Sequence, residues 1–165
     1  MGTVPDDRLR ALAAELQSTC LARGLRIATA ESCTGGLVGA AITAIPGSSG
    51  YYLGGFITYA DEVKRDLAGV PAEVLAAHGA VSAQVAVAMA EGARSRLGAD
   101  LAVSVTGVAG PDGGSAAKPV GLTYVGVADA NGTDARRYVW PGDREANRQD
   151  SAVAALELAL ERVRA

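Results

Sequence analysis

Apolar residues recur at helical spacing in three long stretches of the chain. The first stretch predicts a helix over residues 6–22 with one apolar face: Leu9, Leu12, Ala13, Leu16 and Cys20. The second predicts a helix that Ser82 caps and Gly98 ends. The third predicts a helix from Asp143 to the end of the chain, and two short helical turns are expected over 61–67 and 71–77.

Short apolar or β-branched runs alternate with these helices and predict strands. They cover residues 25–28, 51–59, 101–105, 120–129 and 133–139. Asn131-Gly132 predicts an antiparallel hairpin between the last two runs, and Gly54-Gly55 predicts a bulge or a close backbone approach. The alternation of strands and helices predicts an α/β fold, organised as a single domain over residues 1–165.

The segment from Thr29 to Gly36 places a hydroxyl, a thiol and two glycines between a predicted strand and a helix predicted to begin near Thr34. The unpaired N–H groups of a helix start, with the positive end of the helix dipole behind them, would point back at Ser32. Such a turn suits an oxyanion or a phosphate, so the segment predicts a nucleophile beside an anion site. The alternative is that Ser32 and Thr34 are ordinary helix caps.

A second polar, glycine-rich segment covers residues 106–115 and follows the apolar run 101–105. Ligands collect at the carboxyl ends of strands in open α/β sheets, so the two segments are predicted to form opposite walls of one pocket. Arg144 and Arg148 lie four residues apart, share a helix face and suit a phosphate or carboxylate. A solvated face balanced by acidic neighbours is the alternative for these arginines.

Composition excludes several classes of partner. The chain is 49% hydrophobic and 20% charged with a net charge of -3, which argues against a nucleic-acid-binding surface. No apolar run approaches the roughly 20 residues that span a bilayer, and the amino end has no signal-peptide pattern, so we expect a cytoplasmic protein with no membrane partner. Cys20, Cys33 and His78 lack zinc-ligand spacing, so neither a metal nor a cofactor is expected, although carboxylate-bound magnesium stays open.

Six ordered blocks of the sequence resemble the CinA carboxy-terminal domain family. The blocks are Thr29–Gly36, Phe56–Tyr59 with Lys64, His78–Ser82, Thr106–Gly114, Lys118–Gly121 and Gly142–Glu145. The resemblance covers roughly residues 8–163 and implies a three-layer α/β/α arrangement with a mixed, mostly parallel sheet and one antiparallel hairpin. Stand-alone members are nicotinamide-nucleotide amidohydrolases, so it also implies hydrolysis of nicotinamide mononucleotide to nicotinic acid mononucleotide and ammonia.

The resemblance implies roles for four catalytic residues. Ser32 is the expected nucleophile and Lys64 its base, because burial or nearby positive charge can lower the pKa of a lysine toward neutrality. Tyr59 would relay the proton or orient the amide. Thr106, at the head of the glycine-rich loop, would bind substrate or nucleophile. Cys33 is the alternative nucleophile, because a thiolate beside a helix start would be activated.

The expected substrate, a pyridine mononucleotide, also needs binding groups. The backbone at Cys33, Thr34, Gly35 and Gly36 is expected to bind the oxyanion and substrate. Gly107, Gly110 and Asp112 of the second loop are expected to line the substrate site. Arg144 and Arg148 are both candidates for the phosphate, and the choice between them is open.

One block departs from the family pattern, since Tyr59-Ala60-Asp61 stands where relatives commonly have Tyr-Ser-Asn. A carboxylate near Lys64 would raise the pKa of that lysine if the groups touch. The alternative function is a non-catalytic nucleotide-binding or interaction module of the competence/damage-inducible type. We also expect a homo-oligomer, a dimer or higher, paired through Tyr51-Tyr52-Leu53 or the hairpin edge.

Overall fold

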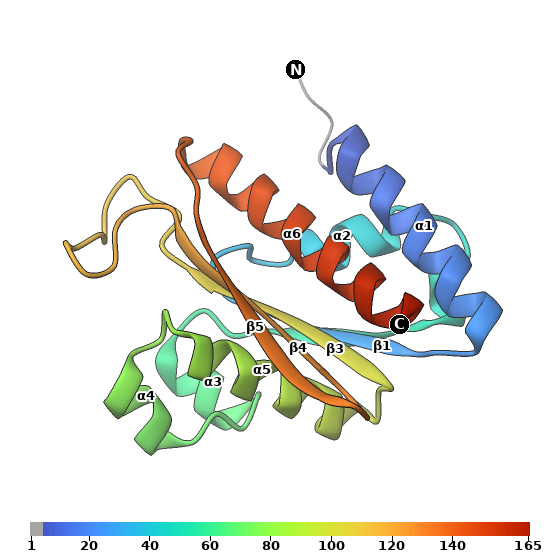
Figure 1. Ribbon diagram of the computed structural model, residues 1–165, viewed down its shortest axis with the longest axis horizontal. Helices are drawn as coiled ribbons and strands as arrows, with labels where there is room; N and C mark the ends of the chain where they lie inside the picture. The colour runs from blue at the N-terminus through green and yellow to red at the C-terminus, as the bar shows by residue number, and fades with distance from the viewer. Residues whose placement is uncertain (1–4) are drawn as a thin grey trace.

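A mixed five-stranded sheet forms the middle of the computed structural model, which describes residues 5–165 (Figure 1). The strand order is β2-β1-β3-β4-β5. The strands are β1 (Ile27–Glu31), β2 (Tyr52–Ile57), β3 (Leu101–Gly107), β4 (Leu122–Asp129) and β5 (Gly132–Val139). β1 pairs in parallel with β2 and β3, whereas β4 is antiparallel to both β3 and β5. The sheet confirms the expected α/β class, including the hairpin around Asn131-Gly132.

Helices cover both faces of the sheet and make three layers (Figure 1). α1 (Asp7–Arg23), α2 (Leu37–Thr43) and α6 (Arg144–Arg164) lie on one face. α3 (Asp61–Asp66), α4 (Ala72–His78) and α5 (Ala83–Leu97) lie on the other, and a 3-10 turn, η1 (Ser48–Gly50), precedes β2. No helix within residues 5–165 is long and apolar enough to cross a membrane. Residues 1–4 of the domain predicted over 1–165 lie outside the described residues.

Apolar side chains fill the space on both sides of the sheet, and the two layers differ in residue size. Larger side chains such as Leu16 and Leu156 pack under α1 and α6. Under α5 the strands present small residues, among them Ala28 and Ala102. A Cβ on Gly126 would lie 2.5 Å from the backbone oxygen of Ala86, so α5 approaches the sheet more closely than side chains would allow.

The β2 edge confirms one expectation and corrects another. Ile27 pairs with Tyr52 and Ala28 pairs with Gly54, so the register shifts at Leu53, one residue before the Gly54-Gly55 pair where a bulge or close approach was predicted. A Cβ on Gly55 would lie 2.1 Å from the Thr29 hydroxyl, which confirms the close approach. Tyr51, expected in a subunit contact, is instead completely buried in the core.

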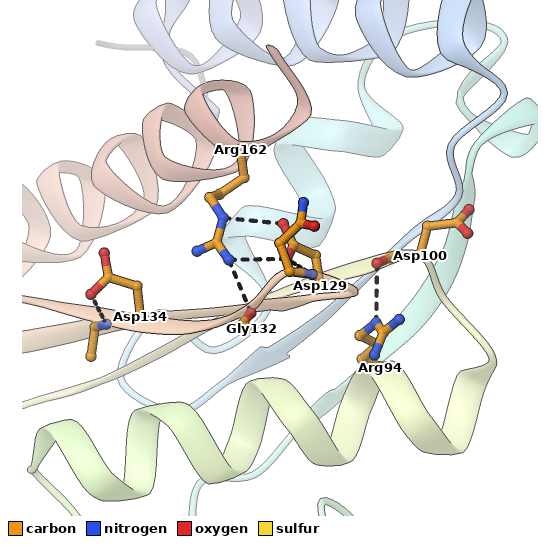
Figure 2. A network of polar contacts seen from close by, with 8 residues as sticks. Arg94, Asp100, Asp129, Gly132, Asp134 and Arg162 are labelled. Carbon is orange, nitrogen blue, oxygen red and sulfur yellow. Dashed lines mark hydrogen bonds and ion pairs between the residues drawn. The ribbon is translucent and has the colours of Figure 1, made fainter. Parts of the chain in front are cut away.

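An ion pair and backbone contacts join the elements at the opposite end of the sheet from the candidate site (Figure 2). Arg162 of α6 donates two hydrogen bonds to the Asp129 carboxylate, at 3.0 and 3.1 Å, and one to the Gly132 carbonyl. Arg94 of α5 donates to the backbone oxygen of Asp100. Arg162 thus fastens α6 to β4 and β5, and Arg94 fastens α5 to the loop before β3.

Candidate active site

The carboxyl ends of β1, β2 and β3 bring three predicted site residues to one edge of the sheet. Ser32 follows β1, Tyr59 lies just beyond β2, and Thr106 lies near the end of β3. The Ser32 N–H donates to the Val105 carbonyl at 2.9 Å, which continues the pairing of β1 with β3 and fixes the backbone of Ser32. The parallel pairing therefore places the serine where open α/β sheets hold their ligands.

A cavity of about 210 Å³ opens at this edge. Its lining combines both predicted loops with the turn before α5 and the start of α6: Ser32, Cys33, Tyr59, Asp61, Lys64, Ala80, Val81, Thr106, Gly107, Ala109 and Arg144. All four predicted catalytic residues are in this lining. The structure thus brings residues that are far apart in the sequence around one cavity.

Lys64 extends from α3 into the cavity wall and is 1% exposed. Its Nζ donates to Ser32 Oγ at 3.1 Å and to the backbone carbonyl of Tyr59 at 2.9 Å. The nearest carboxylate oxygen, on Asp61, lies 3.9 Å away and belongs to an exposed side chain. Burial lowers the pKa of Lys64 below the ordinary lysine value, while the charge of Asp61 opposes that change.

The Glu31 side chain caps the start of α2, and this turn differs from the one that the sequence predicts. The strand continues through Glu31, and α2 begins at Leu37 instead of near Thr34. The buried Glu31 carboxylate accepts hydrogen bonds from the Thr34 hydroxyl at 2.7 Å and from the Val38 and Gly39 N–H groups at 2.9 and 3.0 Å. The chain's own carboxylate therefore takes the place at this helix start that was predicted for a ligand anion.

The turn after Ser32 has two unused backbone donors, at Cys33, which lines the cavity, and at Thr34, which does not. The Gly35 N–H donates to the Ser32 carbonyl at 3.0 Å, so this predicted oxyanion donor is already used. Within residues 5–165, the N–H groups of Cys33 and Thr34 have no hydrogen-bond acceptor. Gly35 and Gly36 have φ values of 58° and 106°, a left-handed turn that favours glycine and delays the helix.

The pKa of Cys33 is shifted in the opposite direction from that of an activated thiol. The residue is 7% exposed, and burial, with a contribution from Glu31, raises the pKa of its thiol to about 11. The charges of Arg148 and Lys64 lower this pKa, but burial outweighs them, and α2 begins only four residues later with Glu31 at its start. At neutral pH Cys33 is therefore a protonated thiol.

Residues of the glycine-rich loop occupy different positions relative to the cavity. The Thr106 hydroxyl donates to the Ala80 carbonyl at 2.8 Å and so ties β3 to the turn before α5. Gly107 lines the cavity, and the Gly110 carbonyl accepts a hydrogen bond from Arg144. Asp112 is exposed and is not part of the cavity lining.

The two candidate arginines bind different parts of the chain. Arg144 lines the cavity, where it donates to the Gly110 carbonyl at 2.8 Å and to the Tyr59 hydroxyl at 3.3 Å. Arg148 donates to the carbonyls of Cys33 and Thr34 at 3.1 and 2.9 Å and is not in the cavity lining. Arg144 therefore lines the cavity, while Arg148 braces the turn after Ser32.

Sequence reasoning missed Asn147 as well as Glu31. The buried Asn147 amide donates to the Ala109 carbonyl and accepts from the Gly142 N–H, both at 3.0 Å, so it joins α6 to the glycine-rich loop. Asn147 and Ser151 lie four residues apart on the buried face of α6, and this polar pair is the sequence signal that could have revealed the role. Among residues 5–165, no group of three His, Cys, Asp or Glu side chains is placed to hold a metal ion.

Comparison with known protein families matches residues 9–163 to the CinA C-terminal domain. The chain belongs to the CinA C-terminal domain family. A CinA-like protein of Geobacter sulfurreducens is 54% identical over 135 residues, which are 82% of this chain and 33% of that protein. The chain thus spans about a third of the length of the curated relatives it matches.

Solved CinA structures have the same fold. The competence/damage inducible protein CihA from Agrobacterium tumefaciens is 41% identical, covers all of both chains and superposes with a TM-score of 0.91. The competence damage-inducible protein A from Klebsiella pneumoniae is 36% identical over 94% of this chain and 97% of that one, also with a TM-score of 0.91. This CinA domain therefore shares its α/β architecture with crystallised members of the family.

Proposed function

We propose that this CinA domain hydrolyses the carboxamide of nicotinamide mononucleotide, with Ser32 as nucleophile and Lys64 as base. The observation that carries the proposal is the buried Lys64 amine 3.1 Å from the Ser32 hydroxyl. A serine attacks an amide only when a neighbouring group accepts its proton. An amine whose pKa is lowered by burial supplies such a group without a histidine.

The proposed reaction uses these contacts. The neutral Lys64 amine takes the Ser32 proton as Oγ bonds to the carboxamide carbon, and the N–H groups of Cys33 and Thr34 stabilise the resulting oxyanion. The Lys64 ammonium then protonates the amide nitrogen, the C–N bond breaks and ammonia leaves. Lys64 next activates water, which cleaves the Ser32 ester to release the carboxylate and restore the serine hydroxyl.

The hollows around Arg144 support a substrate larger than a bare pyridine carboxamide. Ligand pockets for drug-sized molecules measure about 300–1,000 Å³, so the 210 Å³ cavity suits one part of such a molecule. A second hollow of about 470 Å³ shares Ala109 and Arg144 with it and contains Pro111 and Val120. In this proposal the pyridine ring occupies the first cavity, and Arg144 binds the phosphate while Arg148 holds the turn.

An ammonia-release assay on the mononucleotide, the riboside and the dinucleotide tests the proposed activity. The assay is run with and without EDTA on the full chain. We expect turnover of the mononucleotide in both conditions and slower turnover of the riboside, because the riboside lacks the phosphate that Arg144 binds. Tight binding of the mononucleotide without ammonia release would instead support the non-catalytic nucleotide-binding module.

A further inference from the structure

Asp61 provides the one carboxylate in the cavity lining, as far as residues 5–165 are concerned. It lies in the first turn of α3, three residues before Lys64, and its Oδ1 is 3.9 Å from Lys64 Nζ. The Asp61 side chain is 68% exposed, whereas that of Lys64 is 2% exposed. A solvated carboxylate and a buried amine therefore lie 3.9 Å apart in the lining of one cavity.

The other groups in contact with Lys64 do not provide a negative charge at neutral pH, and the buried Glu31 carboxylate near Ser32 is taken up by three hydrogen bonds of its own. Ser32 Oγ and the Tyr59 carbonyl are neutral hydrogen-bond partners. Cys33 is a thiol because burial raises its pKa to about 11. Arg144 lines the same cavity and binds the Gly110 carbonyl and the Tyr59 hydroxyl. Asp61 is thus the one charged group in the lining that attracts the ammonium form of Lys64 more strongly than the neutral amine.

We propose that Asp61 is a positioning residue that steers the Lys64 amine and sets the pH above which Lys64 can accept the Ser32 proton. A neutral amine has two N–H donors and one lone pair. With one N–H on the Tyr59 carbonyl and the other turned to Asp61, the lone pair is left for the Ser32 hydroxyl. The proposal rests on the proposed function for its catalytic part, and its electrostatic part concerns the folded protein alone.

Two opposite kinetic effects follow from this arrangement. Asp61 stabilises the ammonium before the reaction, so its charge moves the onset of activity to higher pH. Asp61 also stabilises the ammonium formed when Ser32 loses its proton, so its charge raises the plateau rate above that onset. A residue with a purely structural role would lower the rate at every pH without moving the onset.

The sequence makes the electrostatic part directly measurable, because Lys64 and Lys118 are the two lysines of the chain. Protein labelled with 13C at lysine Cε is titrated by NMR, and Lys118→Arg assigns the two resonances. In Asp61→Asn, the Lys64 resonance should titrate at a pH lower by up to about one unit. Identical titrations of Lys64 in wild type and Asp61→Asn would overturn the proposal.

Glu62→Gln is the matched control, because Glu62 is an exposed acid in the same first turn of α3 and is not in the cavity lining. It removes the same charge next to Asp61 and should leave the Lys64 titration in place. If Glu62→Gln lowered the titration pH of Lys64 as much as Asp61→Asn does, any negative charge at the start of α3 would have the same effect. That result would contradict a specific role for Asp61. Far-UV circular dichroism of each variant checks that α3 remains folded.

The kinetic arm separates this inference from the proposed function. The acid limb of kcat/KM for ammonia release should move to lower pH in Asp61→Asn, and the plateau kcat should fall about threefold to tenfold. A displaced NMR titration without any ammonia release from wild type would refute the hydrolase and leave the control of the amine by Asp61 intact. A displaced titration with an unmoved acid limb would refute the catalytic part of the inference.

Discussion

Glu31 and Lys64 are both buried ionisable residues next to Ser32, yet their surroundings differ. The Glu31 carboxylate accepts three hydrogen bonds, from Thr34, Val38 and Gly39. The Lys64 amine has two neutral partners and a solvated carboxylate 3.9 Å away. A fully partnered charge fixes the local structure, whereas a partly compensated amine can lose and regain a proton. Glu31 therefore holds the turn after β1 in place, and Lys64 is the residue to which we give the role of base in the proposed reaction.

The largest expected effect is loss of activity in Lys64→Met. Ammonia release at neutral pH should fall by at least about 10³-fold, because the base is removed. The thermal midpoint should equal or exceed that of wild type, because methionine avoids the cost of burying an amine. Lys118→Met is the control, since Lys118 binds the His78 carbonyl outside the cavity and should retain activity. Retention of more than about a tenth of the activity by Lys64→Met would remove Lys64 from the mechanism.

Glu31→Gln should show the reverse pattern, with stability reduced more than chemistry. Urea denaturation should give a free energy of unfolding lower by about 1–3 kcal/mol, because a neutral amide replaces the acceptor of three hydrogen bonds. Ammonia release by the folded variant should fall far less than in Lys64→Met. The exposed substitution Glu62→Gln should remain within about 0.5 kcal/mol of wild type. Unchanged stability of Glu31→Gln would contradict the structural role assigned to Glu31.

Arg144 and Arg148 differ in the same way as Lys64 and Glu31: we expect the first to bind the substrate and the second to stabilise the fold. Arg144→Ala should raise KM for the mononucleotide about tenfold to 100-fold, because Arg144 lines the cavity. It should lower the free energy of unfolding by only about 0.5–1.5 kcal/mol, because it frees one backbone carbonyl, that of Gly110. Arg148→Ala should lower the free energy of unfolding by about 1–3 kcal/mol, because it frees the carbonyls of Cys33 and Thr34. Steady-state kinetics and urea denaturation of both variants measure this. An exchange of the two phenotypes would reverse the assignment.

The smallest expected effect is a pH-dependent difference in stability between wild type and Lys64→Met. The pKa of Lys64 is lower in the folded protein than the ordinary value of 10.5. At a pH between the folded-state pKa and 10.5, the unfolded chain therefore binds more protons than the folded protein. Wild-type stability relative to Lys64→Met should therefore rise with pH through this window and level off above 10.5. The Cys20 thiol titrates alike in both proteins, so its contribution cancels. Because Lys64 lowers the pKa of Cys33, both proteins are compared in a Cys33→Ala background. A difference that does not change with pH would show that Lys64 has an unperturbed pKa.

Local patterns were enough to predict most of the fold. The apolar periodicity of α1, α5 and α6 and the Asn131-Gly132 turn gave elements whose boundaries agree with the structure to within a few residues. The start of α2 could not be predicted because its cap is the side chain of Glu31, a residue of the preceding strand. A pattern-based cap search looks next to the helix, where Thr34 stood out.

The candidate site could be predicted as a set of residues but not as an arrangement. The sequence blocks contained Ser32, Lys64, Tyr59 and Thr106, and the parallel strands explain why they converge. Helical spacing could not separate Arg144 from Arg148, because their partners lie on loops from other parts of the chain. Nor could it give the pKa of Cys33, which depends on burial by the folded structure.

Ammonia release from nicotinamide mononucleotide by wild type, Ser32→Ala and Cys33→Ala, measured side by side at equal concentration, tests the central claim most directly. The account predicts turnover by wild type, a loss of at least about 10³-fold in Ser32→Ala, and activity within about tenfold of wild type in Cys33→Ala. Full turnover by Ser32→Ala would contradict it, because the hydroxyl that faces Lys64 would then have no part in the reaction.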